Sequence, residues 1–84
     1  MKRINNRQYE CIATVVEIRH KSTSYYGNPS KWVTFTDEEG TRTGYTATNV
    51  TCGYSCGNYL NKKAAIVGHF TKSGNFIIDY MRNA

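Results

Sequence analysis

One stretch of the chain, residues 31–48, constrains the fold most, because it contains two strand-like arms separated by a turn. In the first arm, apolar Val33 and Phe35 alternate with Trp32 and two threonines, and this period of two predicts a strand with one buried face. An acidic turn ends at Gly40, and glycine can adopt the positive φ that a tight hairpin with a bulge needs. The second arm is rich in Thr and Tyr, which suit a pleated, half-buried surface. We therefore predict a β-hairpin here.

Three further segments have strand patterns, and they lie at residues 9–21, 64–71 and 76–81. The first begins with apolar residues on both faces and ends with charged residues on one, which is typical of a strand bending around a small barrel. Gly68 interrupts the second and predicts a bend or bulge. Residues 49–63 contain glycines and asparagines that disfavour a regular helix, so we predict an irregular connection with at most one helical turn near its end.

The length of the chain, 84 residues, indicates one domain. We assign residues 9–81 to it, with a basic flexible tail at 1–8 and a short tail at 82–84. Five short strands must close up or cover their edges. The sequence thus predicts an all-β protein, built as a small five-stranded barrel.

Two segments of this pattern resemble the oligonucleotide/oligosaccharide-binding (OB) family. Val-Thr-Phe-Thr-Asp-Glu-Glu-Gly at 33–40 is similar to the second strand and turn of many OB domains, and 62–81 is similar to their final hairpin. The resemblance spans residues 9–81. The predicted order of three strands, a connector and a two-strand hairpin is that of the family, and the resemblance implies a small five-stranded, partly open Greek-key barrel. The connector departs from the family because it lacks a convincing helix, and an SH3-like barrel is the alternative fold.

The charge of the chain is unequal, with eleven Lys and Arg against six Asp and Glu, a net charge of +5. Three of the acids cluster at 37–39, so the remaining surface is more basic than the net value. Seven tyrosines are many for so short a chain, and Tyr is a half-wet residue. A small, basic, aromatic-rich domain suits a polyanionic partner, most simply nucleic acid. A positive charge that only aids solubility is the alternative explanation.

The OB resemblance implies a binding surface on strands two and three and on the loops at the barrel rim. Trp32 lies opposite the predicted core residues, so it should face outward as a stacking platform; the alternative is that it closes one end of the barrel. Gly44 can mark a bulge, so the sequence does not decide whether Tyr45 faces the core or the solvent. We predict binding of single-stranded DNA or RNA with low sequence specificity, by aromatic stacking and phosphate contacts. The predicted nucleic-acid-binding residues are Trp32, Tyr25, Tyr26, Lys31, Arg19, Lys21, Arg42, Lys62 and Lys63.

A protein-interaction module, such as a small inhibitor or adaptor, is the second hypothesis. Loops rich in Tyr, Gly, Ser and Asn at 22–30 and 49–61 suit protein recognition as well. Rings that share a groove with cations favour nucleic acid, whereas rings on a flat patch away from Lys31 and Arg42 favour a protein partner. An exposed edge strand leaves both a monomer and a homodimer open.

Other functional classes find little support in the sequence. Cys52 and Cys56 have a weak metal-ligand spacing, and the remaining thiol and two histidines lie far away in the chain, so we predict no metal and no cofactor. We find neither a nucleophile in a recognisable context nor a phosphate-cradling glycine loop, so we predict that the protein is not an enzyme.

No apolar run reaches membrane-spanning length, and the N-terminus lacks a hydrophobic signal region. Three cysteines agree with a reducing compartment, so we expect a cytoplasmic protein without membrane contact.

Overall fold

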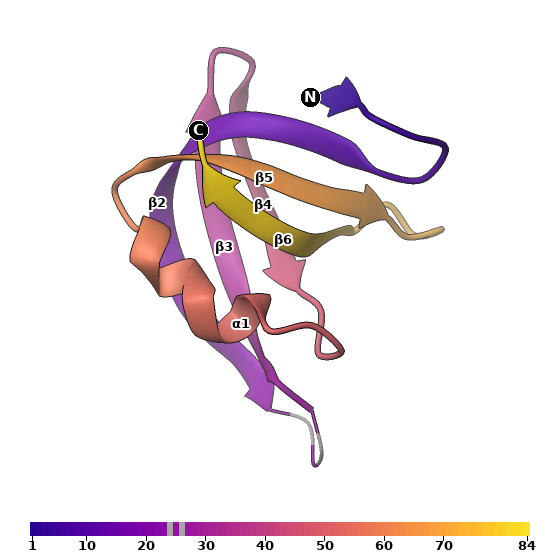
Figure 1. Cartoon of the computed structure of the whole chain (residues 1–84), viewed down its shortest axis with the longest axis vertical. Coiled ribbons are helices and arrows are strands. Elements are labelled where there is room, and N and C mark those ends of the chain that lie inside the picture. Colours follow the sequence, from indigo (N-terminus) through magenta and orange to yellow (C-terminus); the bar gives the residue numbers. More distant parts are fainter. Residues whose placement is uncertain (24, 26) are drawn as a thin grey trace.

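A six-stranded sheet curls into a barrel in the computed structural model, which describes residues 1–23, 25 and 27–84 (Figure 1). A short α-helix, α1 (Cys52–Ser55), and a 3-10 helix, η1 (Cys56–Tyr59), connect the fourth strand to the fifth. The strands are β1 (Lys2–Arg3), β2 (Tyr9–Thr23), β3 (Pro29–Asp37), β4 (Gly40–Thr46), β5 (Lys63–Phe70) and β6 (Phe76–Asn83).

The long strand β2 closes the barrel. Strands pair in the order β1-β2-β3-β4-β6-β5, and β2 pairs a second time, with β5. The first half of β2 pairs with β5 and its second half with β3, so the strand curves around the barrel (Figure 1). β4 and β6 run parallel, and the other neighbours are antiparallel. The protein is thus all-β, as predicted, and its closed five-stranded mixed barrel is consistent with an OB-like architecture.

The core fills the inward face of the sheet. Val33 and Phe35 are buried, which confirms the alternation predicted for the central hairpin, and Val15 on β2 is fully buried beside them. The Phe35 ring centroid lies 6.1 Å from that of Phe76, which in turn lies 5.1 Å from that of Phe70. Because inward residues of β2, β3, β5 and β6 meet there, together with buried residues of α1 and η1, the apolar residues share a single core.

Three register shifts within the described strands each leave one residue unpaired: Val16 and Lys21 on β2, and Asp79 on β6. Such β-bulges bend a strand and redirect side chains. The bulge at Val16 explains why the burial of β2 changes half-way along the strand. The bulge at Asp79 lies opposite the step from Val67 to Gly68, where a Cβ on Gly68 would stand 2.2 Å from a backbone carbonyl oxygen of β6. The bulge predicted at Gly68 is therefore confirmed.

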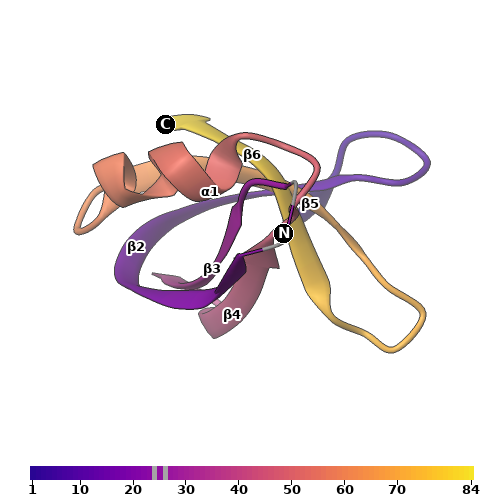
Figure 2. The ribbon, with the colours of Figure 1, turned by 90° about the horizontal axis from the view of Figure 1, so that it is seen from below.

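The prediction of an irregular connection was wrong for residues 52–59, which form α1 and η1. Gly53 allows this arrangement, because a Cβ there would lie 1.8 Å from the carbonyl oxygen of Pro29. The glycine that lowers helix propensity thus permits α1 to pack closely against β3. α1 contacts both β3 and β6 (Figure 2). Neither α1 nor η1, the helices of the described residues, has the length and apolar character that crossing a membrane requires.

Part of each segment that we assigned to a tail joins the sheet. Lys2 and Arg3 form β1 and pair with the start of β2. The segment that follows, residues 5–8, is a tight turn, because the Asn5 side-chain oxygen accepts the backbone N–H groups of Arg7 and Gln8 at 2.9 and 2.8 Å. We call this segment the N-terminal turn. At the other end of the chain, β6 continues to Asn83.

Candidate functional site

Two aromatic rings and one cation meet on the outward face of β3 and β4. Trp32 is paired directly with Tyr45, and their ring centroids lie 5.3 Å apart in an edge-to-face arrangement. The Lys21 ammonium lies 5.6 Å from the Trp32 ring centroid and 4.7 Å from that of Tyr45, within the range of cation–π attraction. We call these three residues the aromatic–cation cluster. Its position explains why Trp32 is half-buried although it faces away from the core.

The cluster belongs to a row of side chains that crosses all five barrel strands. Cross-strand partners in a sheet project to the same face, and successive pairings link neighbours across β2, β3, β4, β6 and β5. Four strand spacings of about 4.8 Å give this path a length of about 19 Å. We call it the transverse row, and its residues are Arg19, Trp32, Tyr45, Ile77 and His69.

The face beside the cluster is polar but uncharged along the central hairpin. Thr34 and Thr43 are paired, with their hydroxyl oxygens 3.1 Å apart. At the β2 end, Arg19 Nε lies 3.2 Å from a Glu17 carboxylate oxygen, and both side chains are largely exposed. Ion pairs of this kind contribute little to stability, so the Arg19 guanidinium can exchange Glu17 for an external anion at low cost.

The structure brings together three of the residues that the sequence analysis selected: Trp32, Lys21 and Arg19. Tyr25 lies on the β2–β3 loop and is 90 % exposed. Tyr26, which we also selected, lies outside the described residues. Tyr45, which the sequence left between core and surface, is half-buried and belongs to the cluster.

The other selected cations lie elsewhere. Lys31 precedes Trp32 and points to the opposite face, where its charge partly offsets the burial that raises the pKa of Cys56. Arg42 is paired with the core residue Phe35 and therefore projects away from the transverse row. Lys63 is the first residue of β5 and Lys62 precedes it, whereas the row crosses β5 near its other end.

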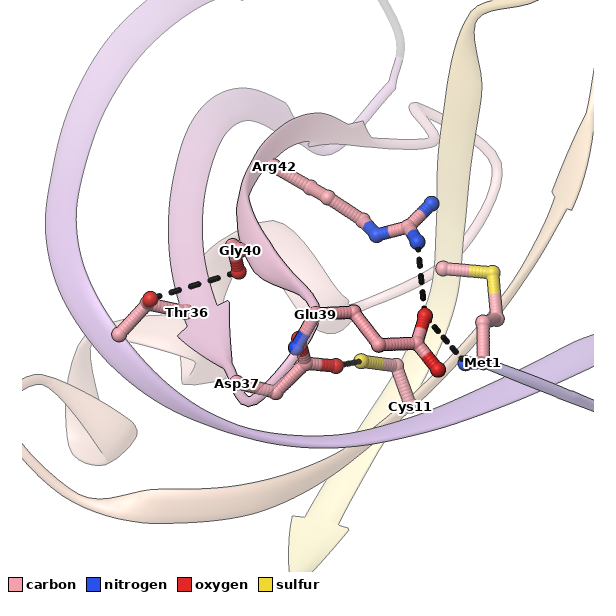
Figure 3. Close-up of polar contacts among 7 residues, drawn as sticks. All are labelled: Met1, Cys11, Thr36, Asp37, Glu39, Gly40 and Arg42. Atoms are coloured by element: carbon pink, nitrogen blue, oxygen red, sulfur yellow. Dashed lines mark hydrogen bonds and ion pairs between the residues drawn. The ribbon is translucent and has the colours of Figure 1, made fainter.

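Arg42 instead belongs to a network around the acidic turn, at the β3–β4 end of the barrel (Figure 3). A nitrogen of its guanidinium lies 3.1 Å from a carboxylate oxygen of Glu39, and the N-terminal amine of Met1 lies 3.5 Å from the same oxygen. The Cys11 thiol donates to Asp37 at 3.1 Å, and this bond is the main cause that lowers the pKa of Asp37. Burial, aided by Asp37, raises the pKa of Cys11 to about 11. Internal partners thus satisfy two of the three acids of this turn.

A second polar cluster, at the His69 end of the transverse row, was missed by the sequence analysis. The Asp79 carboxylate accepts a hydrogen bond from the Gln8 side chain at 2.9 Å and lies 3.0 Å from His69 Nδ1. The other ring nitrogen of His69, Nε2, lies 3.5 Å from an Arg7 guanidinium nitrogen. These residues come from the N-terminal turn and from β5 and β6, so no local sequence motif predicts the cluster. The glycine before His69 was the one available signal, since it predicted the bulge.

The cysteines play no part in either cluster. Cys52 and Cys56 are buried free thiols, and burial raises the pKa of Cys52 to about 12. Within the described part of the chain, no three His, Cys, Asp or Glu side chains converge as metal ligands. Comparisons with family models, curated proteins and solved structures found no match for this chain.

Proposed function

We propose that this protein is an OB-type barrel that binds single-stranded nucleic acid along the transverse row with little sequence preference. One observation carries the proposal: the Lys21 ammonium lies over two outward aromatic rings, Trp32 and Tyr45, on neighbouring strands. Single-stranded nucleic acids are held in this way, by bases stacked on rings while cations contact the phosphates. The OB resemblance supports the same surface, because β3 and β4 are the second and third strands of the barrel.

The three residues of the aromatic–cation cluster and Arg19 each have a role in this proposal. A base stacks on Trp32 or Tyr45, and stacking tolerates any base because every base has a π-face. Lys21 and Arg19 contact the phosphates on either side of that base. The net charge of +5 attracts the strand, and the acidic turn, which would repel it, lies at the β3–β4 turn with its charge partly neutralised.

The test is a titration with a labelled single-stranded oligonucleotide, followed by fluorescence anisotropy and by quenching of Trp32, the one tryptophan of the chain. We expect quenching, and an affinity that falls log-linearly with salt. Trp32→Ala should weaken binding about 5- to 150-fold, the loss that one base stack of about 1–3 kcal/mol implies. Tyr54→Ala is the matched control, because Tyr54 is 68 % exposed but lies on α1. Absence of binding at low salt by both probes would refute the proposal.

A protein-interaction module is the second candidate function. The observation that favours it is the position of Lys31 and Arg42, which lie away from the rings of the cluster. A protein partner does not need phosphate contacts, and an outward aromatic patch suits it. The titration separates the two functions, because a protein-binding module would leave Trp32 fluorescence unchanged by oligonucleotides of any strandedness.

A further inference from the structure

A groove with a volume of about 560 Å³ lies at the His69 end of the transverse row. The N-terminal turn forms one side of it, the connector at 47–50 another, and the outward residues of β5 and β6 its floor. Figure 1 shows the N-terminal turn and the β5–β6 turn on the same side of the barrel. The groove thus combines segments that are far apart in sequence, and its chemistry differs from that of the aromatic–cation cluster.

A chain of hydrogen bonds orients the polar edge of this groove. Asp79, at its bulge, is held by Gln8 and contacts His69 Nδ1, which directs His69 Nε2 towards Arg7. His69 and Asp79 are mostly buried, with side-chain exposures of 16 % and 20 %. Arg7 is exposed, so its remaining N–H groups are available to a ligand. The edge therefore presents a guanidinium beside an imidazole whose orientation is fixed by a carboxylate.

The other walls of the groove carry three apolar side chains, Ile77 on the floor and Ala47 and Val50 on the connector, beside the polar Asn49. A guanidinium next to such a surface suits a ligand with an anionic group attached to a flat or apolar body. The Asp79 carboxylate of the same groove is engaged by Gln8 and His69, which leaves the Arg7 guanidinium for the ligand. A phosphate monoester gains more from a guanidinium than a phosphodiester does, because it carries a charge of about −1.5 to −2 and three acceptor oxygens.

The place of the groove in the row decides where such a phosphate would come from. Ile77 and His69 are the last members of the row, and the N-terminal turn stands beyond them. A strand that lies along the row therefore ends here. We propose that the groove binds the terminal phosphate monoester of a single-stranded nucleic acid, with Arg7 as the phosphate ligand, His69 positioning its guanidinium, and the end nucleoside over Ile77. This inference rests on the proposed function and extends it to recognition of a strand end.

Three oligonucleotides of one sequence test the inference: one with a 5′-phosphate, one with a 3′-phosphate and one with neither. We expect one phosphorylated form to bind about tenfold more tightly than the unphosphorylated strand, the order expected of charge-assisted hydrogen bonds. The better form identifies the end that occupies the groove. Arg7→Gln should remove the difference between the phosphorylated and the unphosphorylated strands. Lys62→Gln, which removes the same charge just before the far end of β5, should preserve the difference.

A second measurement, on the unaltered protein, follows the His69 ring signals by NMR during addition of a nucleoside monophosphate. A shift of these signals that saturates supports the groove even if oligonucleotides fail to bind, a result that would refute only the proposed function. Equal affinities for all three oligonucleotides overturn the inference and leave the proposed function standing. A phosphate preference that survives Arg7→Gln also overturns it, because the phosphate would then bind elsewhere.

Discussion

Replacing Gly53 with alanine should destabilise the protein strongly, although alanine is the better helix former. Gly53 lies in α1, and a Cβ at this position would stand 1.8 Å from the carbonyl oxygen of Pro29. The obstacle is backbone of β3, so no side-chain rotation relieves the clash. Either α1 or the start of β3 must move until the contact reaches the 3.4 Å at which ordinary van der Waals contact begins.

The expected loss of stability is the steric penalty of the added methyl group minus the gain in helix propensity. Overpacking a closely packed site costs about 1–3 kcal/mol, and a backbone obstacle places Gly53→Ala at the upper end, about 3 kcal/mol. The gain in helix propensity from glycine to alanine is at most about 1 kcal/mol. The net loss in the free energy of unfolding is therefore about 2 kcal/mol. For a domain of this size, that loss corresponds to a Tm lower by about 8–16 °C.

The measurement is urea or thermal unfolding, followed by circular dichroism. The matched control is Gly57→Ala, because Gly57 lies in η1 and a Cβ there meets nothing within 4 Å. The control should leave stability unchanged or raise it by up to about 1 kcal/mol. If Gly53→Ala unfolds at the same midpoint as Gly57→Ala, α1 does not pack against Pro29, and the reasoning fails.

Two further predictions concern pH and the aromatic–cation cluster. Folding raises the pKa of Cys11 from 9.0 to about 11 and that of Cys52 from 9.0 to about 12. Because the unfolded chain loses these protons first, the stability that the protonated thiols contribute is intact below pH 9 and falls as the pH rises above it. Urea midpoints at pH 8 and 10.5 measure this fall, which should be smaller in Cys52→Ala; an equal fall in both proteins would contradict the assignment. Lys21→Met should cost less than about 1 kcal/mol of stability but lower the slope of log affinity against log salt by about one. An unchanged slope in oligonucleotide titrations would show that Lys21 contacts no phosphate.

The sequence predicted those features that depend on local alternation. The period of two in β3 placed Phe35 in the core and Trp32 outside, because neighbouring residues of a strand point to opposite faces. The same alternation could not place Arg42, because the register of the hairpin, set by its turn, pairs Arg42 with Phe35. The helix α1 was missed for a different reason: propensity treats Gly53 as a cost, whereas packing against β3 requires a glycine there.

The transverse row lay beyond sequence reasoning, because it depends on contacts between distant segments. Tyr45 and Ile77 become neighbours through the short parallel pairing of β4 with β6, and no local pattern encodes that register. The same holds for the groove, which needs the N-terminal turn to fold back beside β5 and β6. Periodicity thus identifies which face of each strand is outward, and tertiary pairing decides which outward residues meet.

The two bulges that flank the row connect barrel closure with the candidate site. A one-residue shift normally sends every following side chain to the other face of a strand, so an inserted residue is tolerated only where a β-bulge leaves it unpaired. Lys21 and Asp79 are the unpaired residues of two such bulges, and they bend β2 and β6. Each one also supplies the charge next to the row: Lys21 lies over the rings, and Asp79 orients His69. Replacing either residue should therefore change ligand binding more than stability, whereas deleting either one should disrupt both together.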